Sequence, residues 1–390
     1  MGLFPADAGL RIAMVAGEAS GDMLGARLID AIRARRPDAR FVGIGGPKMQ
    51  AAGLESLYPQ ETLAVRGYVE VLRSLRSILA IRRELKAKLL AERPDVFIGV
   101  DAPDFNLHVE QVLKSAGIRT IHYVSPSIWA WRGERVFKIK QAVNRVLALF
   151  PMEAPIYQAA GVPVSYVGHP LAESMPLQPD REAARELLHI LPRQATVFTL
   201  MPGSRQGEVD VMAPLFIATA REILRHEPDA QFLVPLATRA TFDRFEQLLW
   251  RLKAHQLPIR RLFGHAQHAM VAADAVLVAS GTATLEVALA KRPMVISYKI
   301  SPITYRIVKR KLKLPYVGLP NILCGEFIVP ELLQDDATPA NLAQALLNAW
   351  RDPDYRVWLD DKLTELHLTL KQDSAARAAQ AVLEVVGENA

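Results

Sequence analysis

Two segments far apart in the chain share one pattern: an apolar run, a tight turn of small residues, then the start of a helix. Gly17–Asp22 (GEASGD) follows the apolar run Arg11–Ala16, and Ser280–Glu286 (SGTATLE) follows the apolar run Ala275–Ala279. Such a turn exposes unpaired backbone N–H groups at the positive end of a helix dipole, which suits an anion. One such turn in each half predicts an α/β protein with two doubly wound, Rossmann-like domains that face each other across a cleft.

The rest of the chain repeats this alternation of strand and helix, which is typical of parallel sheets covered on both faces. In the first half, strands are predicted at Leu10–Ala16, Arg40–Ile44, Asp95–Val100, Arg119–Val124, Val146–Phe150 and Val164–Val167. In the second half, they are predicted at Thr196–Leu200, Gln231–Pro235, Ile259–Phe263, Ala275–Ala279 and Met294–Ser297.

The length of 390 residues exceeds that of one typical core and also favours two domains. The segment Pro170–Asp180 contains three prolines and is interpreted as a linker. We therefore expect a first domain over residues 1–170 and a second over 171–350. The tail from Thr338 to Val386 is predicted to be helical, with a start near Pro339 and a break at Asp352-Pro353. The C-terminal helices over 351–390 have the option of packing back on the first domain.

Composition narrows the class of protein. The chain is 50% hydrophobic and 23% charged, as expected of a folded globular protein, and no run reaches the roughly 18 apolar residues that span a bilayer. The single Cys324 cannot form an internal disulfide, which fits a reducing cytosol and a small core residue. There is no Cys/His cluster, so we expect neither a metal nor another cofactor.

The net charge of +6 is consistent with an ordinary solvated surface, but two stretches favour a more specific role. Arg306–Lys313 (RIVKRKLK) is strongly basic, and Tyr68–Lys86 predicts an amphipathic helix with an apolar face bordered by arginines. Such a helix covers a sheet or lies on an anionic membrane surface. Nucleic acid is a weaker interpretation because no aromatic and basic residues interleave.

Polar residues follow the strands of the second half. Thr282 and Thr284 stand where a helix begins, and their hydroxyls can bond phosphate oxygens, while Glu286 can accept two bonds from a ribose diol. The alternative is that the hydroxyls cap the helix and Glu286 completes a capping box. Met201–Arg205 (MPGSR) places a guanidinium where it can meet a diphosphate, and Asn321 adds an amide.

In the first half, Asp101 ends the predicted strand Asp95–Val100, so its carboxylate would enter the crevice as a general base. The alternative is a cap on a helix that begins near Asn106, for which Asp104 is better placed.

Two further features of the first half have two interpretations each. His122–Arg132 (HYVSPSIWAWR) carries two tryptophans that line a sugar-binding wall or belong to a packed loop. His169 stands beside the predicted linker, with a cleft role and a structural role equally open.

Taken together, these motifs resemble the lipid A disaccharide synthases. Several are long and peculiar to that family, and they run in its order from Arg11 to about Asp335. The matching segments are Gly17–Asp22 (GEASGD), Gly99–Asn106 (GVDAPDFN), His122–Arg132 (HYVSPSIWAWR), Val167–Pro170 (VGHP), Pro202–Arg205 (PGSR), Ser280–Glu286 (SGTATLE) and Leu319–Asn321 (LPN).

The resemblance implies a GT-B glycosyltransferase fold and an inverting reaction without a metal. The enzyme would join UDP-2,3-diacylglucosamine to the 6-hydroxyl of 2,3-diacylglucosamine 1-phosphate (lipid X), and release UDP. Arg205 and the turn at Thr282 would meet the charge that develops on the leaving diphosphate, and Asp101 would take the acceptor proton. No strand-end Asp-x-Asp pair is present to hold a metal.

The resemblance also assigns binding residues and a location. UDP-sugar binding falls to Ser204, Arg205, Gly281, Thr282, Thr284, Glu286 and Asn321. Acceptor binding falls to Glu18, Ser20, Gly21, Asp22, Asn106, Ser125, Trp129, Trp131 and Arg132. The acylated substrates imply a cytoplasmic protein held peripherally at the inner membrane, as a monomer or a homodimer.

Three other functions compete with this one. A UDP-N-acetylglucosamine 2-epimerase has the same fold but needs acid and base groups around the donor sugar and no acylated acceptor. A nucleotide-binding sensor without turnover leaves Asp101 and the tryptophans unexplained. A nicotinamide dehydrogenase is weaker still, because neither Gly17–Asp22 nor Gly43–Gly46 spells G-x-G-x-x-G.

Overall fold

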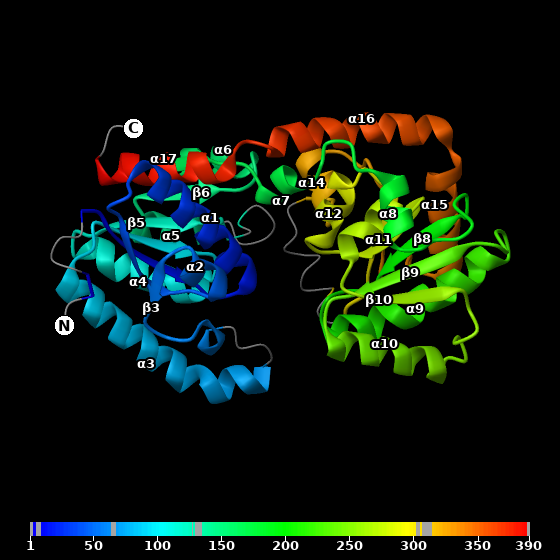
Figure 1. Ribbon diagram of the computed structural model, residues 1–390, viewed down its shortest axis with the longest axis horizontal. Helices are drawn as coiled ribbons and strands as arrows, with labels where there is room; N and C mark the ends of the chain where they lie inside the picture. The colour runs from blue at the N-terminus through cyan, green and yellow to red at the C-terminus, as the bar shows by residue number, and fades with distance from the viewer. Residues whose placement is uncertain are drawn as a thin grey trace. The chain divides into compact units, whose positions relative to one another are not determined.

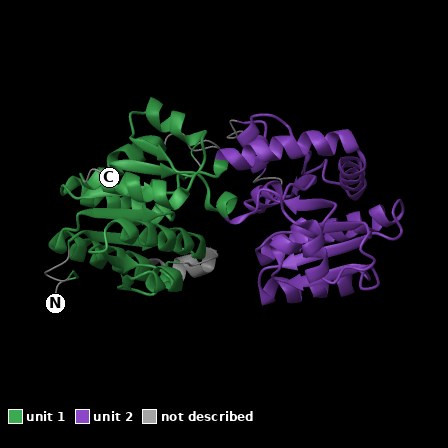
Figure 2. Cartoon of the chain, turned by 45° about the horizontal axis from the view of Figure 1, so that its top comes forward, with its two compact units in different colours: residues 1–173, 370–390 green, residues 174–369 purple. Residues whose placement is uncertain are grey.

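The computed structural model describes residues 3–4, 9–63, 68–126, 128, 135–301, 305 and 314–387, without the side chains of 68–75. The chain forms two compact units (Figure 2). Unit 1 combines Met1–Glu173 with Leu370–Ala390, and unit 2 is Ser174–Thr369. Each is built on one parallel sheet flanked by helices (Figure 1), so the predicted α/β class is confirmed.

Unit 1 holds a seven-stranded parallel sheet in the order β3-β2-β1-β4-β5-β6-β7. Its strands are β1 (Arg11–Ala16), β2 (Arg40–Ile44), β3 (Leu54–Ser56), β4 (Val96–Val100), β5 (Arg119–Tyr123), β6 (Arg145–Ala148) and β7 (Val164–Tyr166). Its first helices are α1 (Ala19–Arg35), α2 (Pro47–Ala51), α3 (Tyr68–Glu92) and α4 (Pro103–Ser115). They are followed by α5 (Arg135–Ala142), α6 (Glu153–Ala159) and α7 (Pro170–Ser174). The strand order reverses between β1 and β4, and ligands of such sheets bind outside the carboxyl ends at that reversal.

The core of unit 1 lies on both faces of this sheet. Along β1, Ile12 and Met14 join a cluster with α1, whereas Ala13 and Val15 join a second cluster with α3 and α4. The helix α17 (Ser374–Val386) packs on α1 in the first cluster, where Val382 is fully buried. The last helix of the chain is therefore part of the core of unit 1.

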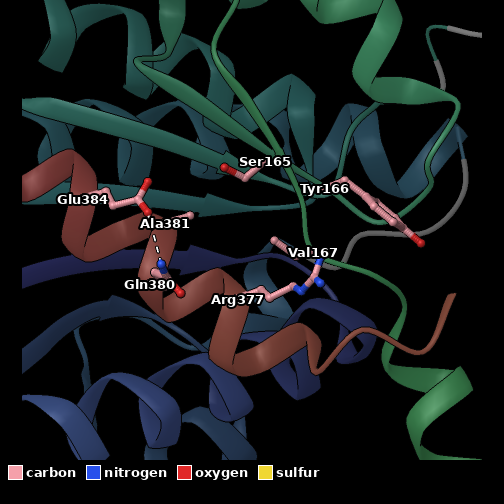
Figure 3. A pocket seen from close by; sticks show the side chains of 7 residues that line it. All are labelled: Ser165, Tyr166, Val167, Arg377, Gln380, Ala381 and Glu384. Atoms are coloured by element: carbon pink, nitrogen blue, oxygen red, sulfur yellow. Dashed lines mark hydrogen bonds between the residues drawn. The ribbon is translucent and has the colours of Figure 1, made fainter. Parts of the chain in front are cut away.

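A small cavity of about 200 Å³ marks the seam between α17 and β7 (Figure 3). Within it, Gln380 Nε2 donates a hydrogen bond to Glu384 Oε1 over 3.4 Å. Its lining residues are Ser165, Tyr166, Val167, Arg377, Gln380, Ala381 and Glu384. Because none of them is a predicted site residue, we interpret the cavity as a packing seam.

Unit 2 holds a six-stranded parallel sheet in the order β10-β9-β8-β11-β12-β13. Its strands are β8 (Val197–Met201), β9 (Gln231–Leu236), β10 (Ile259–Phe263), β11 (Ala275–Ala279), β12 (Met294–Tyr298) and β13 (Glu331–Leu333). Its first helices are α8 (Arg181–Leu187), α9 (Gln206–Leu224), α10 (Arg239–Arg251) and α11 (Ala266–Ala272). They are followed by α12 (Ala283–Leu289), α14 (Leu319–Cys324), α15 (Pro339–Arg351) and α16 (Pro353–Leu370). Here the order reverses between β8 and β11.

A buried ion pair fixes the beginnings of β8 and β11. Asp274, just before β11, accepts hydrogen bonds from the Val197 amide (2.8 Å) and from Arg185 Nη2 (2.9 Å). The Arg185 side chain is only 3% exposed and also donates to three backbone carbonyls. Because a buried arginine with this many partners has one orientation, it holds both strands in place.

Each predicted strand overlaps an observed one. The sequence missed β3 and β13, which have three residues each and are too short for a period-two pattern. The predicted linker Pro170–Asp180 begins with α7, and the C-terminal helices divide between the units, α16 with unit 2 and α17 with unit 1. The basic stretch Arg306–Lys313 lies outside the described residues. Among the helices that the structure describes, none is long and apolar enough to cross a membrane.

Candidate functional site

The turn after β1 forms one side of the candidate site in unit 1. Glu18, the N-cap of α1, is exposed together with Ser20. A Cβ on Gly17 would stand 2.9 Å from the Cβ of Ala102, so glycine lets this turn lie against the turn after β4. The structure thus brings Glu18 and Ser20 to the edge of the sheet where Asp101 lies.

The turn after β4 carries Asp101 in an unusual backbone conformation. Asp101 and Ala102 both have positive φ angles, 54° and 45°, in the left-handed region that residues with a Cβ rarely occupy. The Asp101 side chain is half-buried, and its carboxylate has no hydrogen-bond partner among the described residues. A carboxylate held in this way is available to an incoming proton donor.

The helix that follows corrects one alternative from the sequence. α4 begins at Pro103, earlier than expected, and its N-cap is Ala102, so neither Asp101 nor Asp104 is the cap. Asp104 is 90% exposed and lies 3.3 Å from the guanidinium of Arg135.

Other residues assigned to the acceptor support this edge from inside. Asp22 accepts hydrogen bonds from the amides of Lys48 and Met49 at the start of α2, and Gly21 lets α1 approach β1 closely. Asn106 is fully buried, and Ser125 shares a 2.8 Å hydrogen bond with the Tyr157 hydroxyl. These contacts give all four residues a structural task. Trp129, Trp131 and Arg132 lie outside the described residues.

In unit 2, the turn after β8 is closed by a carboxylate from its own helix. Glu208 Oε2 accepts hydrogen bonds from the amides of Ser204 (3.0 Å) and Arg205 (3.2 Å). Gly203, with φ of 123°, is needed because a Cβ there would stand 2.5 Å from the Cβ of Glu208. The guanidinium of Arg205 is 74% exposed, and its contact is Glu208 Oε1 at 3.1 Å. An exposed ion pair of this kind is weak, so the guanidinium is readily available to another anion.

The turn after β11 begins beside it, because Val278 and Met201 are paired in register. Gly281, with φ of 156°, has open space where a Cβ would be, and Thr282 is exposed as the N-cap of α12. Thr284 is different: its buried hydroxyl donates to the Gly281 carbonyl and accepts from the Leu319 amide.

Glu286 and Asn321 have opposite surroundings. Glu286 is half-buried, burial raises the pKa of its carboxyl group, and this side chain has no hydrogen-bond partner in the described part of the chain. The capping-box alternative is therefore wrong for Glu286. Asn321 is fully buried, with its oxygen bonded to the amides of Ile328 and Val329 and its NH₂ group bonded to Val329 O and Glu331 Oε1. Its contact with UDP remains a prediction that these bonds do not favour.

Sequence reasoning missed several supporting side chains. The Gln60 carboxamide donates to the carbonyls of Ala16 and Glu18, and the Glu331 carboxylate accepts from the amides of Val317 and Gly318. Most of these partners are distant in sequence, so no local pattern indicates them. Glu208 was detectable as an acidic residue in the first turn of a helix. Within the described ranges, no three His, Cys, Asp or Glu side chains gather as metal ligands.

Comparison with known proteins decides the family. The family model described as lipid-A-disaccharide synthetase matches residues 12–385. The chain belongs to this family. The lipid-A-disaccharide synthase of Chromobacterium violaceum is 66% identical over 98% of this chain and 99% of its own length. That of Dechloromonas aromatica is 58% identical over 96% and 98%. The chain is accordingly an enzyme, a glycosyltransferase that makes the lipid A disaccharide.

Solved structures show the same fold in more distant proteins. HepE of Anabaena in complex with UDP and glucose has a TM-score of 0.59, with 12% identity over 97% of this chain and 100% of its own. A Listeria monocytogenes protein provisionally assigned as a UDP-N-acetylglucosamine 2-epimerase has a TM-score of 0.62, with 11% identity over 97% of this chain and 96% of its own. The fold alone therefore does not separate a transferase from an epimerase, and the family membership does.

His169 belongs to the packing of unit 1. Its backbone amide donates to Leu370 O over 2.8 Å, its Nδ1 accepts from the Leu171 amide over 3.2 Å, and its ring lies 5.3 Å from that of Phe150. Burial lowers the pKa of the ring to about 4, so His169 is neutral at neutral pH. These contacts favour its structural interpretation.

Acid should destabilise unit 1 through His169. The unfolded chain takes up this proton below about pH 6.5 and the folded chain only below about pH 4, so the stability present above pH 6.5 falls between these values. The loss is at most about 3 kcal/mol. We expect the Tm of His169→Gln to fall less than that of the wild type between pH 7 and pH 4.5. The exposed control His226→Gln should follow the wild type, and a His169→Gln curve parallel to the wild type contradicts the assignment.

Proposed function

We propose that this enzyme transfers the sugar of UDP-2,3-diacylglucosamine to the 6-hydroxyl of 2,3-diacylglucosamine 1-phosphate, with inversion at the anomeric carbon. The products are lipid A disaccharide 1-phosphate and UDP. The observation that carries the mechanism is the half-buried Asp101 carboxylate, unpartnered among the described residues, at the strand reversal of unit 1 in a chain of this family. A hydroxyl group becomes a good nucleophile only as it loses its proton, and Asp101 accepts that proton.

The acceptor is bound around this base. Glu18 and Ser20 are exposed beside the Asp101 turn and are proposed to contact the acceptor sugar. Trp129, Trp131 and Arg132 remain part of this proposal through their motif alone. Gly21, Asp22, Asn106 and Ser125 are proposed to act indirectly, because their side chains or their close packing serve the sheet edge itself.

The donor is bound at the strand reversal of unit 2. The exposed Arg205 guanidinium, the Thr282 hydroxyl and the backbone at Ser204 and Gly281 are proposed to hold the diphosphate. Charge builds up on the leaving UDP as the bond between the anomeric carbon and the diphosphate oxygen breaks, and a fixed cation stabilises it. Glu286 is proposed to accept hydrogen bonds from the ribose diol, which would give its desolvated carboxylate the partners it lacks in the described structure. Thr284 supports this turn through the Gly281 carbonyl.

The acylated substrates require contact with a membrane, and α3 is proposed to provide it on the cytoplasmic side of the inner membrane. Leu85 and Leu89 are fully buried and fix the C-terminal half of α3 to the core, whereas Leu79 is 43% exposed. Arg76 and Arg83 are exposed near it. Basic residues around exposed apolar ones favour anionic lipid headgroups.

A basic groove between α4 and α5 extends this surface. Its volume is about 400 Å³. Arg135, Lys138 and His108 line it, and so does Asp104, which is 3.3 Å from Arg135. Burial lowers the pKa of His108, and the charges of Lys86 and Arg82 on α3 lower it further. The positive potential therefore continues from α3 onto α4, which supports the orientation of this face toward anionic lipid.

Removing the Glu286 carboxylate should weaken UDP binding. A hydrogen bond to a charged group contributes about 1.5–3 kcal/mol, so Glu286→Ala should raise the Kd for UDP by roughly 10–100-fold. Isothermal titration calorimetry measures this directly. Asp243→Ala, which removes an exposed carboxylate of α10, is the control and should bind UDP normally. Unchanged affinity in Glu286→Ala would remove Glu286 from the nucleotide site.

Removing the basicity of Asp101 should stop the transfer and leave the fold intact. Asp101→Asn keeps the shape of the side chain, and loss of a general base typically lowers kcat by about 10²–10⁴-fold. UDP affinity should not change, because the donor residues are in unit 2. The matched control is Asp104→Asn on the exposed face of α4, which should keep nearly full activity. An active Asp101→Asn beside an inactive Asp104→Asn would transfer the role to Asp104.

Membrane binding should depend on the exposed arginines of α3. Each basic residue near an anionic surface contributes about 1 kcal/mol, so Arg76→Glu/Arg83→Glu should weaken binding to phosphatidylglycerol vesicles by at least about tenfold. Vesicle sedimentation measures this, and Leu79→Ser should weaken binding further. The controls are Arg225→Glu/Arg239→Glu and Leu187→Ser, at exposed positions of unit 2. Equal losses in both sets would mean that binding is nonspecific.

A further inference from the structure

Three fully buried polar side chains lie behind the Asp101 turn, and the reaction above uses none of them directly. Asn106 and Glu110 stand one turn apart on α4, and His122 is on β5; all three are 0% exposed. His122 Nδ1 and Glu110 Oε1 are 2.7 Å apart. Burying such groups costs folding free energy unless hydrogen bonds or ion pairs offset the loss of water.

The space for this group is made by Gly99. In the sheet, Gly99 is paired in register with His122 on one side and with Val15 on the other. A Cβ on Gly99 would stand 2.2 Å from Glu110 Oε1 and 2.9 Å from Asn106 Cγ. The Glu110 carboxyl group and the Asn106 carboxamide therefore both pack against the backbone of Gly99, two residues before Asp101.

The Asn106 carboxamide ties the turn to the sheet. Its Nδ2 donates to the Asp101 carbonyl over 2.8 Å and to the Val15 carbonyl over 3.3 Å. The Asp101 amide donates to Tyr123 O over 2.8 Å. Two consecutive residues with a Cβ in the left-handed region are strained, so the turn persists only because such bonds hold it.

Two side-chain oxygens in this group lack hydrogen-bond partners among the described residues. Asn106 Oδ1 and Glu110 Oε2 are buried and have no hydrogen-bond partner in the described structure. A carboxylate and an amide oxygen are both acceptors, but a protonated carboxyl group is also a donor. Burial raises the pKa of Glu110, which favours its protonated form, and the nearby His122 only partly offsets this. A proton on Oε2 would satisfy both oxygens at once.

We propose that Asn106, Glu110 and His122 are positioning residues for Asp101. His122 holds the Glu110 carboxyl group through Oε1, and Glu110 donates a hydrogen bond from Oε2 to Asn106 Oδ1. The NH₂ group of Asn106 is thereby directed at the carbonyls of Asp101 and Val15 and keeps the strained turn in place. The effect on catalysis rests on the proposed role of Asp101, whereas the effect on the turn does not.

Glutamine at position 110 provides the decisive comparison. Glu110→Gln keeps an oxygen for His122 and an NH₂ donor for Asn106, so it should rescue most of the kcat and leave the turn protected. Glu110→Leu removes both groups and should lower kcat by at least about tenfold, with the Kd for UDP unchanged. Thr120→Val is the control, because it removes another buried hydrogen bond of β5, to Ala142 O, remote from the turn. It should lower Tm without lowering kcat.

Deuterium exchange of the segment Gly99–Asn106 tests the turn itself. We expect faster exchange in Glu110→Leu and wild-type exchange in Glu110→Gln and Thr120→Val. If Glu110→Leu does not fold, Asn106→Asp serves instead, since it keeps the shape and places a carboxylate against two carbonyls. The proposal is overturned if Glu110→Leu, or Asn106→Asp in its place, exchanges at the wild-type rate in this segment. It is also overturned if Glu110→Gln and Glu110→Leu change kcat and exchange equally. If Asp101→Asn is active but Glu110→Leu still exchanges faster in this segment, Asp101 is not the base, and the proposal for the turn still holds.

Discussion

The reversal of strand order in each sheet is the constraint on which the rest of the molecule depends. Between β1 and β4, and again between β8 and β11, adjacent strands continue into helices on different parts of the sheet, so their carboxyl ends are left uncovered. Every exposed candidate residue that the structure describes, from Glu18 to Arg205 and Thr282, lies in a turn that begins there or in the first helical turn after it. The strand order, which backbone hydrogen bonds fix, therefore determines where the candidate site residues lie.

A second layer of side chains keeps these turns in shape. Asn106, Thr284 and Glu208 each bond the backbone of a turn that carries a candidate residue, and glycines at positions 17, 99 and 203 leave room for close packing. The exposed candidate residues are few, whereas the residues beneath them form hydrogen bonds to the backbone of the turns. Loss of a supporting residue should therefore affect function by changing the conformation of the turn that carries a candidate residue.

The fold and the turns that carry the exposed candidate residues could be predicted from sequence because their signals are local. An apolar run followed by Gly-Glu-Ala-Ser-Gly-Asp or Ser-Gly-Thr-Ala-Thr marks strand, turn and helix within a dozen residues. What could not be predicted is which polar side chains turn inward. Asp22, Asn106 and Asn321 have the same residue types as ligand-binding groups, but most of their partners are backbone groups, up to 91 residues away. The capping alternatives for Asp101, Asp104 and Glu286 failed for a related reason, because a shift of a few residues in a helix start moves the cap to another side chain.

The packing of α17 in unit 1 has a consequence for how the protein is made. Unit 2 is one continuous stretch of chain, Ser174–Thr369, and is complete when the ribosome reaches its end. Unit 1 begins first but needs Val382 and Leu383 to fill its core against α1. Domains fold as units during synthesis, so the half that emerges first is the last to be finished. Until then, the apolar face of α1 is open to chaperones and to other nascent chains.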